Sequence, residues 1–245
     1  MATFTKSDDL QGAEFVDTDL RGARFVGADL TGVVMRGVDL PRADIDSPWL
    51  FEGDSFFRLN GVDVIPFVEA ELNRRFPGRS QRQAEDPEGL REAWAALGRT
   101  WATTLERAAA MPTGTVDESV DGEWSFAQTL QHLVHATDTW LGRGILELEK
   151  PYHPLGIPRS EDEGASAVQP SYAEVLEARA GRVAMVRDLL ADITGEELAA
   201  PRRNPHNPEY PETVLACVHV ILGEEWEHHR YAVRDLDTIE AKREA

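Results

Sequence analysis

Three scarcities in this sequence narrow what the protein can be. It has one cysteine, Cys217, which excludes an internal disulfide framework and fits a reducing compartment. No apolar run approaches the length of a membrane-spanning helix, and Met1–Leu10 lacks the apolar core of a signal peptide, so we expect a cytoplasmic protein. Basic residues are few, with 25 Lys and Arg against 44 Asp and Glu and a formal net charge of -19. This balance argues against nucleic acid or an anionic membrane as a partner.

Residues 10–45 carry an apolar residue at every fifth position, and a small residue precedes most of these by two positions. A period of five fits neither a helix, which repeats every 3.6 residues, nor a strand, which alternates every two. It suits a square coil in which each side is one pentapeptide and the central residue points inward. The central residues are Leu10, Phe15, Leu20, Phe25, Leu30, Met35, Leu40 and Ile45.

This segment closely resembles the pentapeptide-repeat family, as in Ala23–Gly27 and Ala28–Gly32. The resemblance implies a right-handed β-helix with four pentapeptides per coil, so that the repeats make only two coils. Solenoids generally need about three stacked units to be stable. These two coils should therefore pack against the rest of the chain or against a second subunit, as in a homodimer. Long members of the family mimic DNA, but residues 1–48 are only mildly acidic, with nine Asp and Glu against five Lys and Arg. A packing or dimerisation role is therefore favoured.

The rest of the chain has the apolar spacing and capping residues of helices. Residues 49–83 should form a connector with one helix over 64–76. Residues 84–245 should form a mainly α domain, with helices that open near Asp86, Ser125 and Ser171 and a last helix over 213–236. The helix that opens at Ser125 should run to about Lys150. A crossover loop is expected over 151–170, and a stiff proline-rich loop over 201–211. The predicted organisation is a repeat segment over 1–48, the connector, and the helical domain.

The last expected helix holds a candidate metal site. Glu225 and His229 lie four residues apart on its apolar stripe, and side chains at i and i+4 project together from one helix face. A carboxylate that faces a core is costly unless something pairs with it. The two residues could therefore hold one cation, or they could simply hydrogen-bond to each other. A metal would need a third ligand from a neighbouring helix, and His132 lies on the flank of the apolar stripe of such a helix.

Two motifs make residues 84–240 resemble the DinB-like four-helix-bundle superfamily: Trp124–Leu133, which opens with Trp-Ser and ends with His-Leu, and His229–Ala232. The resemblance implies an up-down four-helix bundle in which a histidine of the second helix and two residues of the last helix bind a divalent metal. It assigns the ligands to His132, Glu225 and His229. The glutamate at position 225 makes the chain similar to the branch of mycothiol-dependent maleylpyruvate isomerase, which has a glutamate at this position.

His135 and His228 are the nearest alternative ligands. Structural zinc sites usually have four protein ligands, so three leave a position for water or substrate. Two nitrogen donors and one oxygen donor suit zinc or nickel, and also iron, cobalt or manganese.

The resemblance implies a thiol S-transferase or isomerase in which the metal activates a low-molecular-weight thiol, such as mycothiol, toward an electrophile. Arg202, Arg203 and His206 are the cationic candidates for binding an anionic part of the substrate. Cys217 is expected to be a buried structural thiol. The alternative is a non-catalytic interaction protein whose pentapeptide coils dock or dimerise and whose metal site is vestigial.

Overall fold

The computed structural model describes residues 3–5, 8–51, 53, 55–158 and 170–244. The chain divides into two compact units, Met1–Asp46 and Ser47–Ala245. Within the described residues, every helix and strand belongs to the second unit, which we call the helical unit. No helix in the described part of the chain is both long and apolar enough to cross a membrane.

The five-residue period of the first unit appears in the structure as a regular series of turns. The backbone has a positive φ at every fifth residue from 12 to 42, and five of these seven residues are glycine. Glycine adopts this conformation without steric cost, which explains its place in the repeat. In alternate turns the backbone carbonyl of a leucine accepts a hydrogen bond from the N–H of the residue three positions later. The side chain of the aspartate just before that leucine accepts a hydrogen bond from the N–H of the residue just after the leucine. The leucines are Leu10, Leu20, Leu30 and Leu40, and the aspartates are Asp9, Asp19 and Asp29.

The side chains of this unit do not form a closed interior. All described side chains from residue 3 to residue 46 are exposed, and the eight central apolar residues remain 43–59% exposed. The described residues of the unit contain no strand. The turn period is therefore present, whereas the right-handed β-helix with stacked central residues stays a prediction.

The helical unit is mainly helical, with two short antiparallel strand pairs. Two of its helices, η1 and η2, are 3-10 helices, and η3 is a π-helix that continues α3. In chain order the elements are β1 (Arg58–Leu59), β2 (Val62–Asp63), α1 (Ile65–Arg75), η1 (Arg79–Gln83), α2 (Pro87–Ala110), η2 (Thr115–Asp117), α3 (Phe126–Thr137), η3 (Asp138–Ile145), α4 (Tyr172–Asp192), α5 (Gly195–Leu198), β3 (Pro201–Arg203), β4 (Pro211–Thr213) and α6 (Val214–Glu244).

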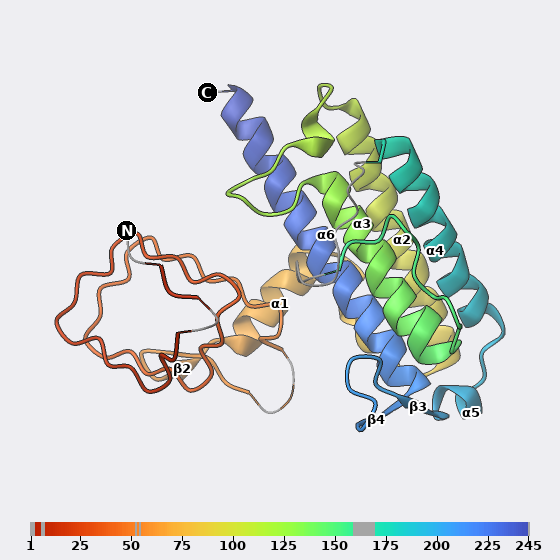
Figure 1. Ribbon diagram of the computed structural model, residues 1–245, viewed down its shortest axis with the longest axis horizontal. Helices are drawn as coiled ribbons and strands as arrows, with labels where there is room; N and C mark the ends of the chain where they lie inside the picture. The colour runs from red at the N-terminus through yellow and green to blue at the C-terminus, as the bar shows by residue number, and fades with distance from the viewer. Residues whose placement is uncertain (1–2, 6–7, 52, 54, 159–169, 245) are drawn as a thin grey trace. The chain divides into compact units, whose positions relative to one another are not determined.

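Four long helices, α2, α3, α4 and α6, pack around one apolar core (Figure 1). Both α4 and α6 pack against α2 and against α3, so α4 and α6 lie on opposite sides of the core. The apolar stripe expected for α2 is confirmed, because Leu90, Trp94, Leu97 and Trp101 are all buried. Asp86 caps this helix by accepting two backbone N–H groups, as its sequence position predicts.

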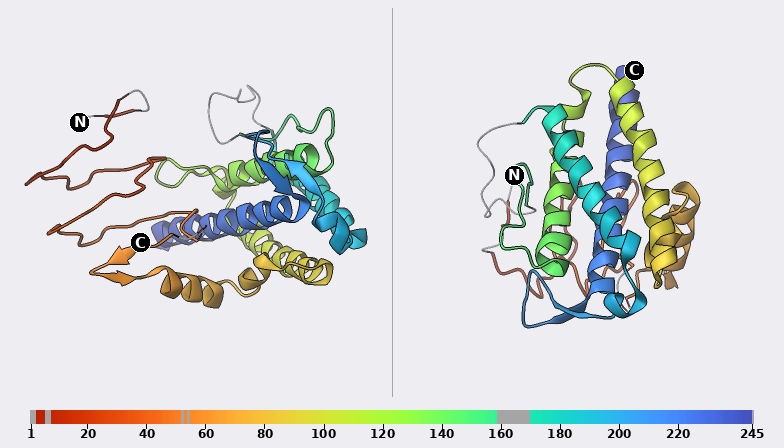
Figure 2. Two further views of the ribbon diagram at one scale, coloured as in Figure 1. Left: turned by 90° about the horizontal axis from the view of Figure 1, so that it is seen from below. Right: turned by 90° about the vertical axis from the view of Figure 1, so that its right-hand side faces the viewer.

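The directions of the helices differ from the up-down order that the resemblance implied. Figures 1 and 2 show that α3 and α4 run in one direction, and that α2 and α6 run in the other. The 21 residues of α4 span about 30 Å, so the connection over 146–171 must return along that length. Its described part does so by lying along α3, while residues 159–169 of the expected crossover loop lie outside the described residues.

Two further elements differ from the expectation. The second helix of the domain does not continue as an α-helix to residue 150, because it widens into η3 at Asp138 and ends at Ile145. The proline-rich loop contains a hairpin, in which β3 pairs with β4 from Pro201 opposite Thr213 to Arg203 opposite Pro211. A two-stranded hairpin has only edge strands, where the missing N–H of proline is tolerated.

Candidate metal site

Three side chains from two helices form a cluster that could hold a metal ion, namely His132 of α3 with Glu224 and His228 of α6. One donor atom from each lies within 4.8 Å of the other two. Oε2 of Glu224 is 3.6 Å from Nε2 of His132 and 3.4 Å from Nδ1 of His228. In the described part of the chain, no other group of three His, Cys, Asp or Glu side chains has this spacing. The cluster is therefore the best candidate for a metal centre.

Local sequence signals place these side chains. Ser125 and Gln128 form a capping box at the start of α3, in which each side chain accepts the backbone N–H of the other. His132 follows about two turns later. Glu224 and His228 are four residues apart on α6 and project from one face of it. Because α3 packs against α6, the histidine of one helix meets the pair on the other.

Backbone carbonyls determine which histidine nitrogens are free to bind a cation. Nδ1 of His132 lies 2.9 Å from the carbonyl oxygen of Ile157, and Nδ1 of His228 lies 2.9 Å from that of Glu224. A carbonyl oxygen only accepts, so each Nδ1 must carry the proton, and in a neutral ring the lone pair is then on Nε2. Metal-ligating histidines usually donate their second N–H in this way. Nε2 of each imidazole and the Glu224 carboxylate are therefore the donors that would fit a divalent cation, whereas the 3.4 Å from Glu224 to His228 is measured at the protonated Nδ1.

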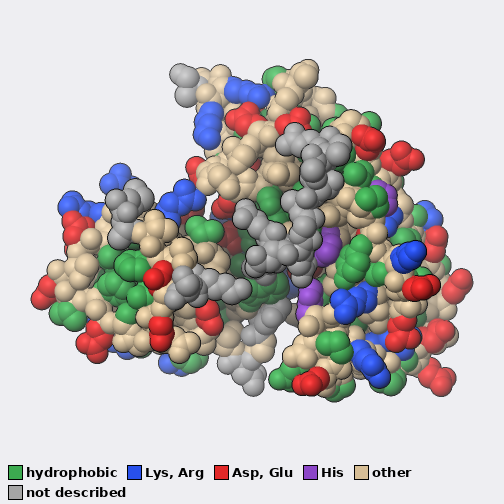
Figure 3. Space-filling model, viewed as in Figure 1, with side chains coloured by type: hydrophobic (Ala, Val, Ile, Leu, Met, Phe, Trp, Pro, Cys, Tyr) green, Lys and Arg blue, Asp and Glu red, His purple; other side chains and the backbone are tan. Residues whose placement is uncertain are grey.

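An aromatic side chain lies against both imidazoles. The ring of Trp124 is 4.6 Å from that of His132 and 6.2 Å from that of His228, and the two imidazoles stack at 4.7 Å. On the face of the helical unit seen in Figure 3, histidine side chains reach the surface among apolar and charged groups. His132 is buried whereas Glu224 and His228 are half-buried, so the cluster lies at the edge of the core.

Glu225 points into the core, away from this cluster. Its side chain is 1% exposed, and both carboxylate oxygens accept hydrogen bonds from Nη2 of Arg179 on α4. Burial raises the pKa of Glu225, and the nearby Arg179 charge opposes that rise. The arginine thus reaches across the core, from the helix opposite α6, to compensate a buried carboxylate.

His229 is also a core residue, with its own partner. Its Nε2 lies 2.8 Å from Oγ1 of Thr104, and its ring meets those of Phe76, Trp101 and Trp226 edge-on. Burial lowers the pKa of His229 to about 4, which keeps the imidazole neutral at pH 7. Glu225 and His229 therefore have separate partners in this structure, and their binding of one shared metal stays a prediction.

The cluster shares His132 with the predicted ligand set and differs from it by one residue at both positions on the last helix. The prediction assumed that the ligands lie on the apolar stripe, which faces the core through residues such as Leu222. Successive helix residues are about 100° apart, so a shift of one residue turns the Glu–His pair from the core to the flank that meets α3. The sequence did hold a signal for Glu224 and His228. Because His132 itself lies on the flank of its helix, its partners should lie on a flank too.

The structure does not bring the three predicted substrate-binding cations to the cluster. Nε of Arg202 donates to the carbonyl of Ile145 at the end of η3, and the ring of His206 meets Trp140 edge-on at 5.5 Å. Arg203 is exposed on β3. About 20 Å of helix separates Ile145 from His132. Arg202 and His206 thus contact the far end of the helix that carries His132.

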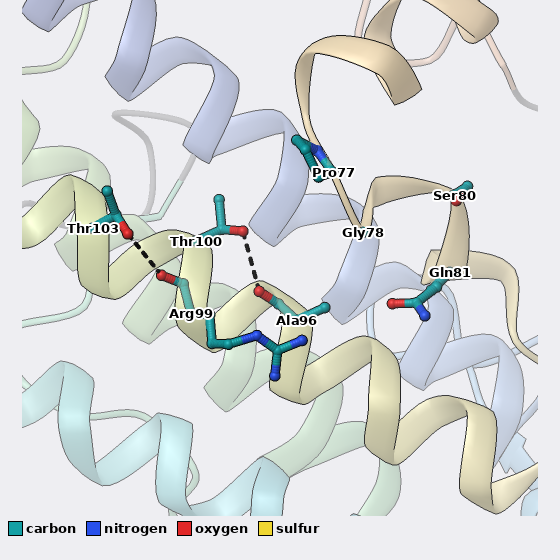
Figure 4. Close-up of a pocket in the computed structure, with 8 residues that line it drawn as sticks. All are labelled: Pro77, Gly78, Ser80, Gln81, Ala96, Arg99, Thr100 and Thr103. Carbon is teal, nitrogen blue, oxygen red and sulfur yellow. Dashed lines mark hydrogen bonds between the residues drawn. The ribbon is translucent and has the colours of Figure 1, made fainter.

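A surface cavity of about 490 Å³ lies between α2 and η1, apart from the cluster (Figure 4). The hydroxyls of Thr100 and Thr103 donate to backbone carbonyls of their own helix, so they are not held out toward a ligand. No cluster residue lines the cavity, which is formed by Pro77, Gly78, Ser80, Gln81, Ala96, Arg99, Thr100 and Thr103.

Comparison with known families gives two matches. The family model described as the DinB superfamily matches residues 96–232, which is more than half of the chain and includes all three cluster residues. The model of pentapeptide repeats matches residues 9–46 in eight copies. Comparison with curated proteins and with solved structures gives no significant match. The chain therefore belongs to the DinB superfamily and carries a segment of pentapeptide repeats before its DinB region.

Proposed function

We propose that His132, Glu224 and His228 bind one divalent cation, and that the protein is a metal-dependent S-transferase or isomerase acting with a low-molecular-weight thiol. The observation that carries the proposal is the close grouping of two imidazoles and one carboxylate from two packed helices. Members of the DinB superfamily often bind a divalent metal, which supports the same conclusion.

The three side chains supply two nitrogen donors and one oxygen donor, a set that suits zinc or nickel and also iron, cobalt or manganese. Three protein ligands leave a coordination position for a small molecule. A bound cation lowers the pKa of a thiol or water that it coordinates. The Glu224 carboxylate offsets part of the cation's charge, and Trp124 covers one side of the imidazoles against bulk water.

The thiol chemistry is proposed by likeness to mycothiol-dependent members of the superfamily. Mycothiol, or a thiol of similar size, would attack an electrophile or add reversibly to a conjugated double bond. The protein's own Cys217 does not fit the role of nucleophile, because it is fully buried and burial raises its pKa to about 11. An external thiol is therefore the proposed nucleophile.

Metal content tests the first part of the proposal. Protein purified without chelator or affinity-metal resin should hold about one equivalent of metal by elemental analysis. His132→Ala, Glu224→Gln and His228→Ala should each hold none, while keeping most of the helical signal in circular dichroism. His206→Ala, which removes an exposed histidine of the hairpin, is the matched control and should retain the metal. Full metal content in the three cluster variants would refute the site.

Thiol consumption tests the second part. Metal-loaded protein should accelerate the reaction of mycothiol with an electrophile that carries a conjugated double bond, and Glu224→Gln should not. Equal rates with the parent, the variant and buffer, over a panel of thiols and acceptors, would refute the transferase proposal and leave the metal site standing.

A second candidate function is suggested by the first unit, whose eight central apolar residues are 43–59% exposed. Such a surface fits a docking or homodimerisation segment, with the metal site then vestigial. Light scattering of the full-length protein and of Leu20→Asp tests whether these residues form a dimer. A dimer that the substitution dissociates would support this function, and a monomer in both cases would refute the dimer.

A further inference from the structure

A short segment runs along α3 directly beside His132. We call residues 151–157 the strap. Its last residue, Ile157, provides the carbonyl oxygen that lies 2.9 Å from Nδ1 of His132. The same residue donates its N–H to the carbonyl of Gln131 at 3.3 Å. The strap therefore contacts His132 and the residue before it.

Three further contacts hold the strap against this helix. Nε2 of Gln131 donates to the carbonyl of Leu155 at 3.1 Å. The N–H of His153 donates to Oδ2 of Asp138 at 2.8 Å. The ring of Tyr152 stacks on that of His135 at 5.1 Å, with 15° between the planes. The strap is thus attached at intervals along its length.

Asp138 connects this attachment to a second helix. Its side chain is 1% exposed, and it accepts hydrogen bonds from Nε and Nη2 of Arg182 on α4, at 2.8 and 3.2 Å. A carboxylate held by a bidentate arginine keeps a fixed geometry. The N–H of His153 therefore meets an acceptor that is itself immobilised between two helices.

Gly156 allows the close approach. A Cβ at this position would lie 3.1 Å from Cβ, 3.2 Å from Cα and 3.3 Å from the backbone N of His135. Two of these atoms belong to the backbone of α3, which cannot move aside as a flexible side chain could. Any larger residue would therefore push the strap away from the helix, and the carbonyl of Ile157 would move with it.

We propose that the strap is a positioning device for the metal site, in which Gly156 and Asp138 hold the Ile157 carbonyl against Nδ1 of His132. His132 is thereby kept as the Nδ1–H tautomer, with Nε2 presented to Glu224. This inference rests on the proposed metal site for its functional meaning. The geometry of the strap itself is tested without any metal.

The experiment compares the full-length protein with Gly156→Val. The matched control is Gly181→Val on α4, where an added Cβ would meet nothing within 4 Å. Nitrogen-15 NMR of the histidine rings in metal-free protein reports the tautomer of His132, whose signals are assigned by their loss in His132→Gln. Calorimetric titration with Zn²⁺ reports affinity. We expect one Nδ1–H tautomer in the parent and the control, mixed tautomers in Gly156→Val, and a 10- to 100-fold weaker affinity for Zn²⁺ in that variant.

An unchanged tautomer and an unchanged Zn²⁺ affinity in a folded Gly156→Val would overturn the inference. If this variant does not fold, Gly156→Ala makes the same comparison with a smaller displacement. If the parent itself binds no Zn²⁺, the metal site is refuted. The tautomer comparison in metal-free protein then still decides whether the strap holds His132, so the two failures are distinguishable.

Discussion

Replacing Glu225 by glutamine should destabilise the protein strongly while leaving the metal site intact. The substitution leaves the Arg179 guanidinium without its carboxylate in the core, where the arginine side chain is 7% exposed. Removal of one partner of a buried ion pair costs about 3–5 kcal/mol in free energy of unfolding. In a domain of this size, each kcal/mol shifts the melting temperature by about 2–4 °C. The melting temperature should therefore fall by roughly 6–20 °C.

Thermal and urea denaturation followed by circular dichroism measure the loss of stability, and elemental analysis measures the metal content of the same protein. Glu224→Gln should give the opposite result, with stability close to that of the parent and no bound metal. The double variant Arg179→Met/Glu225→Leu should recover most of the lost stability, because an apolar pair can replace a buried ion pair at little cost. A stable Glu225→Gln that has lost its metal, beside a Glu224→Gln that retains it, would refute the assignment of the two glutamates.

Three further predictions concern other parts of the helical unit. Burial raises the pKa of Cys217 to about 11, so its contribution to stability is fully present below about pH 9 and about 3 kcal/mol of it is lost as the pH rises from 9 to 11. Cys217→Ala should reduce the fall in stability over this range in urea titrations at several pH values. Gly78→Ala should lower the free energy of unfolding by about 1–3 kcal/mol, because φ is +96° and the added Cβ would lie 2.9 Å from that of Ala96. Gly181→Ala should raise it by up to about 1 kcal/mol, and denaturant midpoints compare the two variants. Arg202→Gln should cost no more than about 1.5 kcal/mol and leave the Zn²⁺ affinity unchanged, and a tenfold loss in calorimetry would show that the hairpin acts on the site.

Sequence reasoning located the helices well because their limits are set by local chemistry. Asp86, Ser125 and Ser171 each cap the helix that their position predicts, since a capping bond involves only neighbours in the chain. The relative direction of α3 and α4 is not set locally. It depends on the path of a long connection, and the composition of that connection does not encode its path.

The site was predicted less completely for a similar reason. His132 could be found from a motif and from its place on a helix flank. The choice between Glu224 and Glu225 depends on which neighbouring helix each one faces, and therefore on the arrangement of the helices. The strap could not be expected at all, because no local pattern in residues 151–157 indicates that they lie against another helix.

The paired glutamates and paired histidines of α6 have a consequence for transferring residue roles between relatives. An alignment that slips by one position on this helix still matches Glu with Glu and His with His, so sequence identity alone does not reveal the slip. The partner on the facing helix does reveal it. Glu225 is identified by an arginine at the position of Arg179, and Glu224 by a histidine at the position of His132. Assignments of metal ligands among related chains should be checked against these two positions on other helices.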